Sequence, residues 1–395
     1  MADQVFPEQD RTFDEEVTGK SRCGIDAEAV QVVRRQFLQR VAPIVLSAGV
    51  LPWCSGCGEW WDNLWKEEEA IPPVRVPDDY STIPMAIEAV QKIPFKQRPS
   101  ILLQVGVHHL SEPLVVTQGV TIRGLVPDQT IIEAAKSVAF HFDSEERCRL
   151  EGVTIHSISS TPPVDNVPGY APEAVLMVTK GTPSLYHCVI QSDMGNGLSL
   201  YGVGASVECD QCRLEGIGSK GIFISEHATG IFAEVVVLEA AYIGVLITTN
   251  ANPLFNYCVI RNGRGNGVDV RTSARGSFHR CRIYSNGYSG VEISTRANPS
   301  FSSTEITNNG HWGINAFEGA MGLFTRCFIL DNGRGEVSSD AGSQMSVNFE
   351  RCITDRSQMD VKDKKELEKS EEEKKKAEEE DRAKKTKTDS KKGNA

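Results

Sequence analysis

The sequence has no long apolar run, because no stretch of 18 or more apolar residues occurs among its 395 residues. A helix needs about 20 consecutive apolar residues to cross a bilayer, so we expect no membrane-spanning segment and no membrane partner. The opening segment, MADQVFPEQDRTFDEEV, also lacks the apolar stretch of a secretion signal. These two absences predict a protein of the cytoplasm or the nucleus.

Basic residues are also scarce, with 42 lysines and arginines against 53 aspartates and glutamates and a net charge of −11. Because phosphate binding requires a basic face, we expect no nucleic-acid partner. The chain has 11 cysteines, and in a protein that is not secreted these are expected to be free thiols. The composition therefore excludes one class of partner and favours cysteines that serve packing.

A 23-residue repeat dominates the second half of the chain. Phenylalanine recurs every 23 residues from Phe232 to Phe324, and Phe349 follows after 25 residues. A second row lies three residues further on and begins earlier in the chain. Its members are Cys188, Cys212, Val235, Cys258, Cys281, Thr304, Cys327 and Cys352. A third row consists of Gly197, Gly221, Gly244, Gly267, Gly290 and Gly313. Three rows in phase indicate a solenoid.

Each coil of this solenoid is predicted to hold about three short strands. The glycines are followed by triplets of alternating polarity such as VDV and VEI, and the cysteines open similar triplets. A coil of about 23 residues has no room for a crossover helix. We therefore predict an all-β solenoid, a right-handed parallel β-helix in which equivalent residues of adjacent coils stack about 4.8 Å apart. Asn286, Asn309 and Asn332 should form a hydrogen-bonded ladder.

The chain divides into three predicted parts. Residues 1–70 form a helical region rich in tryptophan and cysteine, and residues 74–358 form the β-helix. Residues 359–395 form a Lys/Glu-rich tail without an apolar stripe, which is either disordered or a solvated helix. A proline-rich loop over residues 159–173 should project from one coil and offer an interaction site.

The open N-terminal end of the solenoid needs a cap, and a helix near residues 82–91 can supply it. Thr82 is the predicted N-cap, and the predicted apolar face contains Met85, Ile87 and Val90. Further along, Val120–Ile122 and Val153–Ile155 look like the same strand in different coils.

The segments VPDDYSTIPMAIEAV and ILLQVGVHHLSEPLVVTQGVTIRG, followed by coils of the form C-x-I-x-x-N-G, resemble the right-handed β-helix repeat proteins with the pectate lyase-like fold. The chain is most similar to the β-helix region of F-box-only proteins that act as ubiquitin-ligase substrate receptors, over residues 74–355. That resemblance implies an F-box ahead of the coils. Residues 57–66 resemble its end, although the usual Leu-Pro-x-Glu-Ile-Leu start is missing.

The best catalytic candidates are Asp269 and Glu292, which the repeat places at equivalent outward positions on adjacent coils. Two carboxylates about 5 Å apart can share a proton or act as a retaining glycosidase pair. Arg271 lies on the same face, where it neutralises Asp269 in the simpler interpretation. The motifs of polygalacturonases are absent, and outward acids suited to the calcium site of a pectate lyase are sparse.

The metal candidates are Cys54 and Cys57, a CxxC pair without a second pair nearby. Zinc needs four ligands, so this pair alone does not make a site, and we expect no cofactor. A second pair, Cys209 and Cys212, is disqualified because Cys212 belongs to the inward cysteine row. His108 and His109 have no carboxylate nearby in the sequence and are not predicted to be catalytic.

Two functions of different classes remain open. The first is a non-catalytic scaffold that presents a strand face and the loop at 159–173 to a protein partner, including a substrate-recognition role in ubiquitin ligation. On this hypothesis the protein is not an enzyme. The alternative is a carbohydrate-binding or polysaccharide-active β-helix with lyase or hydrolase activity. The sequence indicates no oligomeric state.

Overall fold

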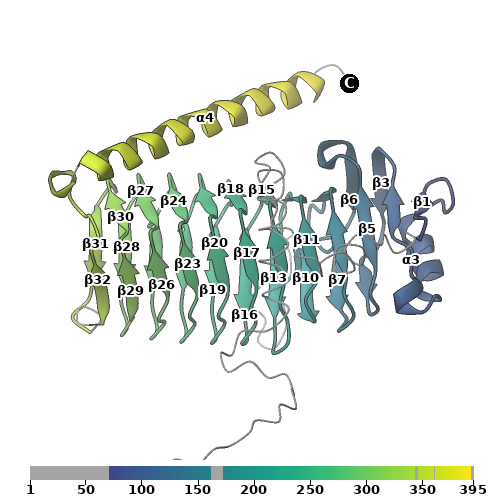
Figure 1. Ribbon diagram of the computed structural model, residues 1–395, viewed down its shortest axis with the longest axis horizontal. Coiled ribbons are helices and arrows are strands. Elements are labelled where there is room, and N and C mark those ends of the chain that lie inside the picture. The colour runs from purple at the N-terminus through teal and green to yellow at the C-terminus, as the bar shows by residue number, and fades with distance from the viewer. Residues whose placement is uncertain (1–70, 162–171, 343–345, 360, 393–395) are drawn as a thin grey trace, which may run out of the picture. The chain divides into compact units, whose positions relative to one another are not determined.

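The computed structural model describes residues 71–161, 172–342, 346–359 and 361–392 of the chain. Within these ranges the chain winds into a parallel β-helix with three sheets that run along its length (Figure 1). Each strand pairs in parallel with the equivalent strand one coil further on. The predicted fold class, a right-handed parallel β-helix with coils of about 23 residues, is confirmed.

We name the three sheets A, B and C in the order in which each coil visits them. Sheet A contains β1 (Val74–Val76), β2 (Ile101–Leu103), β5 (Thr121–Gly124), β8 (Arg149–Glu151), β11 (Ser184–Tyr186), β14 (Glu208–Asp210), β17 (Ile231–Ala233), β20 (Leu254–Asn256), β23 (Ser277–His279), β26 (Ser300–Ser302), β29 (Gly322–Thr325) and β32 (Val347–Glu350). Sheet B contains β3 (Gly106–Leu110), β6 (Thr130–Ala134), β9 (Thr154–Ser157), β12 (Val189–Ser192), β15 (Arg213–Ile217), β18 (Val236–Leu238), β21 (Val259–Arg261), β24 (Arg282–Tyr284), β27 (Glu305–Thr307) and β30 (Phe328–Leu330). Sheet C contains β4 (Leu114–Val116), β7 (Phe140–Asp143), β10 (Ala174–Lys180), β13 (Asn196–Tyr201), β16 (Ile222–Ser225), β19 (Val245–Ile247), β22 (Val268–Val270), β25 (Val291–Ile293), β28 (Trp312–Ala316) and β31 (Gly335–Ser339). The helices in the described residues are α3 (Ile83–Gln91), α4 (Val361–Lys392) and three short 3-10 helices, η1 (Phe95–Gln97), η2 (Pro127–Gln129) and η3 (Arg356–Gln358).

The phenylalanine row forms a stack inside the solenoid, as predicted. Ring centroids of successive coils lie 4.4 Å apart between Phe232 and Phe255 and 5.2 Å apart between Phe324 and Phe349. The rings are nearly parallel throughout the row. Five of the six are buried, whereas Phe349 in the last coil stays partly exposed. Packing of equivalent side chains thus holds each coil against the next.

The cysteine row lies on the inner side of the turn from sheet A to sheet B. Between each phenylalanine and its cysteine, one residue adopts a left-handed backbone, as Tyr257 does with φ 56°. That residue turns the chain sharply, which explains the short three-residue step. The thiol of Cys258 donates a hydrogen bond to the carbonyl of Phe232, one coil back, at 3.5 Å. All the cysteines in the described residues are free.

The asparagine ladder is also present. Asn309 accepts a hydrogen bond from the backbone N–H of Asn286 at 3.1 Å and donates to the side chain of Asn332 at 3.0 Å. The neighbouring glycine row is required by close contact between coils. A Cβ atom on Gly267 would lie 2.7 Å from the carbonyl oxygen of Gly290 and 2.6 Å from a methyl group of Ile283. Glycine is therefore the residue that fits at this position.

The N-terminal cap is α3, for which Thr82 is the N-cap and accepts a hydrogen bond from Met85 N–H. The buried face of the helix consists of Ile83, Ala86, Ile87 and Val90. Met85 was expected on this face but is exposed. Ile87 and Val90 lie on the buried face as predicted, and Ala86 rather than Met85 completes it.

The first coils depart from the 23-residue step, and one predicted equivalence is wrong. Ile122 pairs with Leu150 in sheet A, whereas Ile155 pairs with Ile132 in sheet B. The segments around Ile122 and Ile155 are therefore strands of different sheets. The early coils vary in length, so alignment with a constant step assigns a strand of one sheet to another sheet.

The Lys/Glu-rich tail forms α4, which lies against the outward face of sheet B (Figure 1). The expected alternatives were disorder or a solvated helix. Lys374 and Leu367 are buried, so the helix is not solvated on all sides. None of the helices in the described part of the chain is long and apolar enough to span a bilayer. The predictions for residues 1–70 and for most of the loop at 159–173 lie outside the described residues.

Candidate functional site

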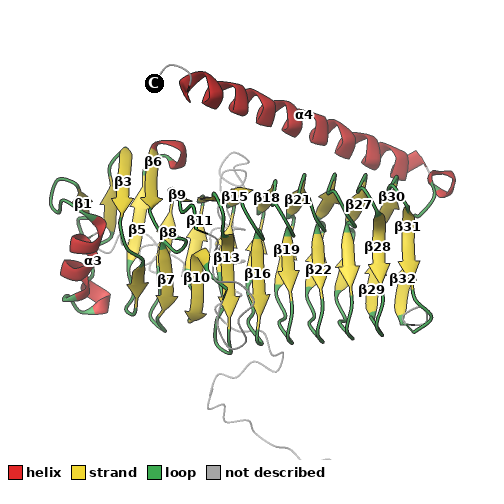
Figure 2. Cartoon of the chain, turned by 180° about the vertical axis from the view of Figure 1, so that it is seen from behind, coloured by secondary structure: helices red, strands yellow, loops and turns green. Residues whose placement is uncertain are grey.

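The predicted pair lies on the outward face of sheet C, where Asp269 is the middle residue of β22. Its neighbours Val268 and Val270 point into the core, and Asp269 therefore points outward. Asp269 and Glu292 are direct register partners on adjacent coils, as predicted. The same row runs along several coils through Ser199, Phe223, Leu246, Asp269, Glu292, Asn315 and Ser338. Figure 2 shows the strands β16, β19, β22 and β28 of this sheet in order along the solenoid.

Asp269 is buried although it points away from the core, with 4% of its surface exposed. Its Oδ1 atom is buried and has no hydrogen-bond partner. Burial raises the pKa of Asp269 to about 6, against the opposing effect of Arg271 and with a smaller contribution from Glu292. A buried carboxyl that lacks a hydrogen-bond donor is held partly protonated near neutral pH.

Glu292 differs from Asp269 in its environment. Its side chain is half-buried, and its Oε2 atom accepts a hydrogen bond from the Asn315 amide at 3.3 Å. Arg271 keeps its guanidinium 3.9 Å from the Asp269 carboxyl and remains partly exposed. The site thus combines a buried acid with a solvated, hydrogen-bonded carboxylate. Two carboxyl groups in such unlike environments are typical of acid–base pairs.

An aromatic row lies beside this pair, in the turn from sheet B to sheet C, and the sequence analysis missed it. Tyr242 and Tyr288 are largely exposed, and the Tyr288 ring lies 4.5 Å from the ring of His311. Backbone hydrogen bonds join consecutive members, such as His311 N–H to the Tyr288 carbonyl at 3.1 Å. Positions 242, 265, 288, 311 and 334 are 23 residues apart and hold Tyr, Gly, Tyr, His and Arg, so the aromatic side chains occupy three of the five positions and the coil of Asp269 has glycine there.

Two histidine–carboxylate pairs on the early coils of sheet B were also missed. His109 lies 3.0 Å from Glu133, and His156 lies 2.9 Å from Asp193. Glu133, the partner of His109, belongs to the next coil and is therefore distant from His109 in the sequence, which is why the pair was not predicted. These side chains are substantially exposed and form surface pairs along the sheet.

No metal centre is evident in the described ranges, where no group of three or more His, Cys, Asp or Glu side chains is arranged to hold an ion. Cys209 and Cys212 are buried free thiols of the interior. Cys54 and Cys57 lie outside the described residues. The expectation that this pair alone does not make a zinc site is therefore not tested.

A polar hollow of about 310 Å³ lies at the edge of α4, away from Asp269. Its lining consists of Glu239, Asn262, Glu378, Asp381 and Arg382. The hollow is open and mostly charged, and Asp381 is already bonded to arginines of sheet B. We therefore place the candidate site at the carboxyl pair of sheet C.

The three parallel sheets and the stacked interior define the chain as a right-handed parallel β-helix protein. Residues 243–359 match the family model for the right handed beta helix region. The solved catalytic domain of Agl-KA has the same fold, with a TM-score of 0.53 and 15% identity over 71% of this chain and 57% of that chain.

Two further solved structures overlap less well. The A-module of the mannuronan C-5 epimerase AlgE4 from Azotobacter vinelandii has a TM-score of 0.44 and 15% identity, over 71% of this chain and 85% of that chain. The periplasmic alginate epimerase AlgG has a TM-score of 0.42 and 13% identity, over 67% of this chain and 81% of that chain.

The match to the Agl-KA structure contradicts the expectation that the protein is not an enzyme, because the fold that this chain shares serves there as a catalytic domain. The expectation rested on the absence of pectinase motifs. One fold carries catalytic sites of many compositions, so the absence of one set of motifs does not exclude catalysis.

Proposed function

We propose that this protein is a polysaccharide-active β-helix in which Asp269 and Glu292 form the acid–base pair of the active site. The observation that carries the proposal is the contrast between two stacked carboxyl groups. Asp269 is buried and has a raised pKa, whereas Glu292 is half-buried and hydrogen-bonded by an amide. Glycosidic bonds are cleaved in most glycosidases by two carboxyl groups in such unlike environments.

The role of the acid falls to Asp269. With a pKa of about 6, a useful fraction of this carboxyl is protonated near neutral pH. It can therefore donate a proton to the oxygen of the bond that breaks. Arg271, 3.9 Å away, limits how far the pKa rises and keeps the group able to release its proton.

The role of the second carboxylate falls to Glu292. Equivalent residues on adjacent strands have backbones about 4.8 Å apart, so side chains of this row can place their carboxyl groups at the separation of about 5–5.5 Å that retaining glycosidases use. Glu292 therefore acts as the nucleophile at the anomeric carbon, and Asn315 orients it through the hydrogen bond to Oε2. The exposed rings of Tyr242 and Tyr288 offer apolar faces for sugar rings at the edge of the same sheet.

Turnover on a panel of neutral and uronate polysaccharides tests this proposal. Release of reducing ends and of unsaturated products is measured for the wild type and for Asp269→Asn and Glu292→Gln. We expect cleavage of at least one polysaccharide, reduced in both variants by about 10²-fold or more. The control is Glu318→Gln, which removes an exposed carboxylate of a neighbouring turn and should retain activity. No cleavage across the panel, or full activity in Asp269→Asn, would contradict the proposal.

Recognition of a protein partner, including a role in ubiquitin ligation, is a second proposal supported by resemblance alone. Residues 1–70, where an F-box would lie, are outside the described residues. The face of sheet B that such a partner would meet in the last coils is already in contact with α4.

A further inference from the structure

The contact between α4 and sheet B is made mainly of charged and polar groups. The helix spans 32 residues but contains few apolar side chains. One of these, Leu367, packs with Leu330 and Met359. Further along, Asp381 pairs with Arg213 and Arg261, and other acids of the helix pair with arginines of the solenoid. A helix held in this way is sensitive to any change of charge at the interface.

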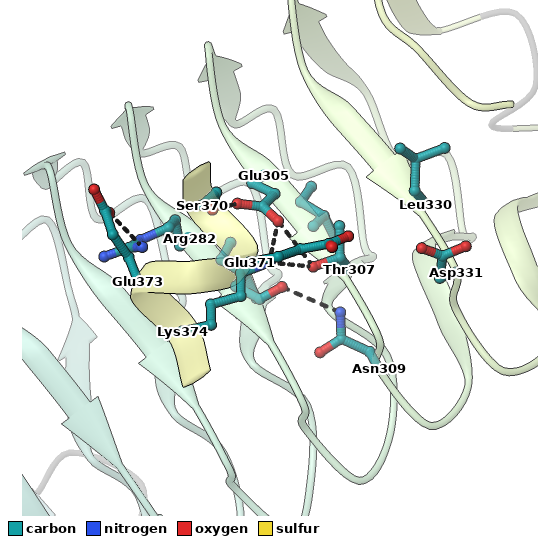
Figure 3. A network of polar contacts seen from close by, with 12 residues as sticks. Arg282, Glu305, Thr307, Asn309, Leu330, Asp331, Ser370, Glu371, Glu373 and Lys374 are labelled. Carbon is teal, nitrogen blue, oxygen red and sulfur yellow. Dashed lines mark hydrogen bonds and ion pairs between the residues drawn. The ribbon is translucent and has the colours of Figure 1, made fainter. Parts of the chain in front are cut away.

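The centre of the interface is Glu305, an outward and buried carboxylate of β27 (Figure 3). It accepts hydrogen bonds from the Ser370 hydroxyl and from the Lys374 ammonium, both on α4. Lys374 is itself buried, lies 4.8 Å from the ring centre of Tyr284 and donates to the Thr307 hydroxyl at 2.9 Å. A single positive charge therefore compensates Glu305, and Ser370 supplies the other donor from α4.

We propose that Ser370 is a phosphorylation site for a serine kinase that prefers acidic substrates, and that its phosphorylation releases α4 from sheet B. Ser370 is followed directly by Glu371, Glu372 and Glu373, which suits a kinase with a basic substrate groove. Two of these acids pair with Arg356 and Arg282 in the docked helix, so the kinase acts on the released form. Modification then traps that form.

The reaction is a phosphoryl transfer from ATP. The Ser370 oxygen attacks the γ-phosphorus, the bond from that phosphorus to the bridging oxygen breaks, and ADP leaves. The hydroxyl proton passes to the catalytic base of the kinase. The product has lost the O–H that Ser370 donates to Glu305, and it carries about two negative charges near neutral pH.

The charge balance explains why release follows. A phosphate on Ser370 would face Glu305, whose ion-pair partner is Lys374. The nearest arginines, Arg282 and Arg356, are already paired with Glu373 and Glu371. Because these groups lie at a partly buried interface, the repulsion is poorly screened by solvent. Release would expose the buried side chain of Arg261, one nitrogen of which has no hydrogen-bond partner even in the docked state.

The test uses the full chain, treated with ATP and an acid-directed serine kinase, with mass spectrometry to locate the phosphate. Amide hydrogen exchange then reports whether α4 is docked. We expect phosphate on Ser370, and exchange in residues 361–384 at least about ten-fold faster than before treatment. The solenoid core should be unchanged, so loss of the fold is distinguished from release of the helix.

A pair of variants makes the same change of net charge at two neighbouring positions, and the second of them is the control. Ser370→Glu places a negative charge opposite Glu305 and should speed exchange in α4. Lys369→Gln also changes the charge by about one unit, but its side chain is exposed, and exchange should stay as in the wild type. Unmodified Ser370 after treatment, or exchange that is unchanged or slower once Ser370 is phosphorylated, would overturn the proposal.

Discussion

Asp269 occupies a position that the two preceding coils fill with apolar residues. Phe223 and Leu246 precede it in the outward row of sheet C, and Glu292 and Asn315 follow it. A carboxyl at the boundary between an apolar and a polar segment loses solvent on one side and gains a like charge on the other. Both effects favour its neutral form, which is the property that a proton donor needs.

The raised pKa of Asp269 makes stability depend on pH. Because the folded pKa of about 6 lies above the ordinary value of 3.8, the folded state binds this proton more tightly than the unfolded state. The stability that the proton provides is present below pH 4 and is lost as the pH rises through about 6. At pH 8 the buried charge of Asp269 lowers the free energy of unfolding by on the order of 3 kcal/mol.

Replacement of Asp269 by Asn should therefore stabilise the protein at pH 8, by about 1–3 kcal/mol, and bring no gain at pH 4. Urea unfolding at the two pH values measures the difference. Glu292→Gln is the control, because it removes a half-buried, hydrogen-bonded carboxylate and leaves Asp269 in place, so the loss of stability that Asp269 causes between pH 4 and pH 8 should remain. An equal effect of Asp269→Asn at both pH values would show that the buried charge is not the cause.

The thiols of the cysteine row should differ in reactivity according to position. Hydrogen bonding with Cys327 lowers the pKa of the Cys352 thiol, which is half-exposed in the last coil. Burial raises the pKa of Cys258. Among these cysteines, Cys352 should therefore react first with an alkylating reagent in the native protein. Cys258, Cys281 and Cys327 should react after addition of denaturant.

Peptide mapping of the labelled cysteines after mild alkylation measures this order. Rapid native labelling of Cys258 or Cys281 would contradict the buried positions. A disulfide between these two residues, found in protein isolated under thiol-trapping conditions, would contradict both the free thiols and the predicted compartment.

At the level of the coil, the phenylalanine stack is the main contact that joins the interior of one coil to the next. Phe278 lies between Phe255 and Phe301, with centroid distances of 4.7 and 4.5 Å, and is buried. Phe278→Ala should lower the free energy of unfolding by roughly 3–5 kcal/mol because it leaves a cavity inside the stack. Chemical denaturation measures the loss.

Arg275→Ala is the matched control for this change, because Arg275 belongs to the same coil and is exposed. Its effect should stay within about 0.5 kcal/mol. Arg282, also a polar residue of a neighbouring strand, is not suitable as a control because it forms an ion pair with Glu373 of α4. Small and equal losses for Phe278→Ala and Arg275→Ala would show that the row is not the core.

The later coils were predictable because equivalent side chains stack, and stacking imposes a constant step on the sequence. From Phe232 to Phe324 the step is 23 residues, so the row that contains Asp269 and Glu292 could be read directly. The earlier coils obey the same pairing with longer turns: Ile122 pairs with Leu150, 28 residues on, and Leu150 with Leu185, 35 residues on. No constant period can align them.

The docking of α4 and the aromatic row were missed for different reasons. Docking depends on charged pairs such as Lys374 with Glu305, which leave no apolar stripe for a periodicity search to find. Tyr242 and Tyr288 do follow the 23-residue step, but they stand in turns rather than strands. The burial of Asp269, which gives the site its chemistry, is a property of three-dimensional packing and has no signature in sequence.

For the molecule as a whole, the solenoid supplies a rigid array in which side chains repeat along one axis. A linear polymer such as a polysaccharide matches this geometry, because it can lie along the coils and meet the same kind of position repeatedly. The carboxyl pair and the aromatic row are on neighbouring parts of that surface. Sheet B, in contrast, is covered in its last coils by α4.

The pH dependence of polysaccharide cleavage tests the central claim most directly. If Asp269 is the proton donor, the rate of the wild type should fall as the pH rises through about 6, by about ten-fold per pH unit above it. Asp269→Asn should lack this activity at every pH. Absence of cleavage by the wild type between pH 4 and 8, or a pH profile that is the same in Asp269→Asn, would contradict the account.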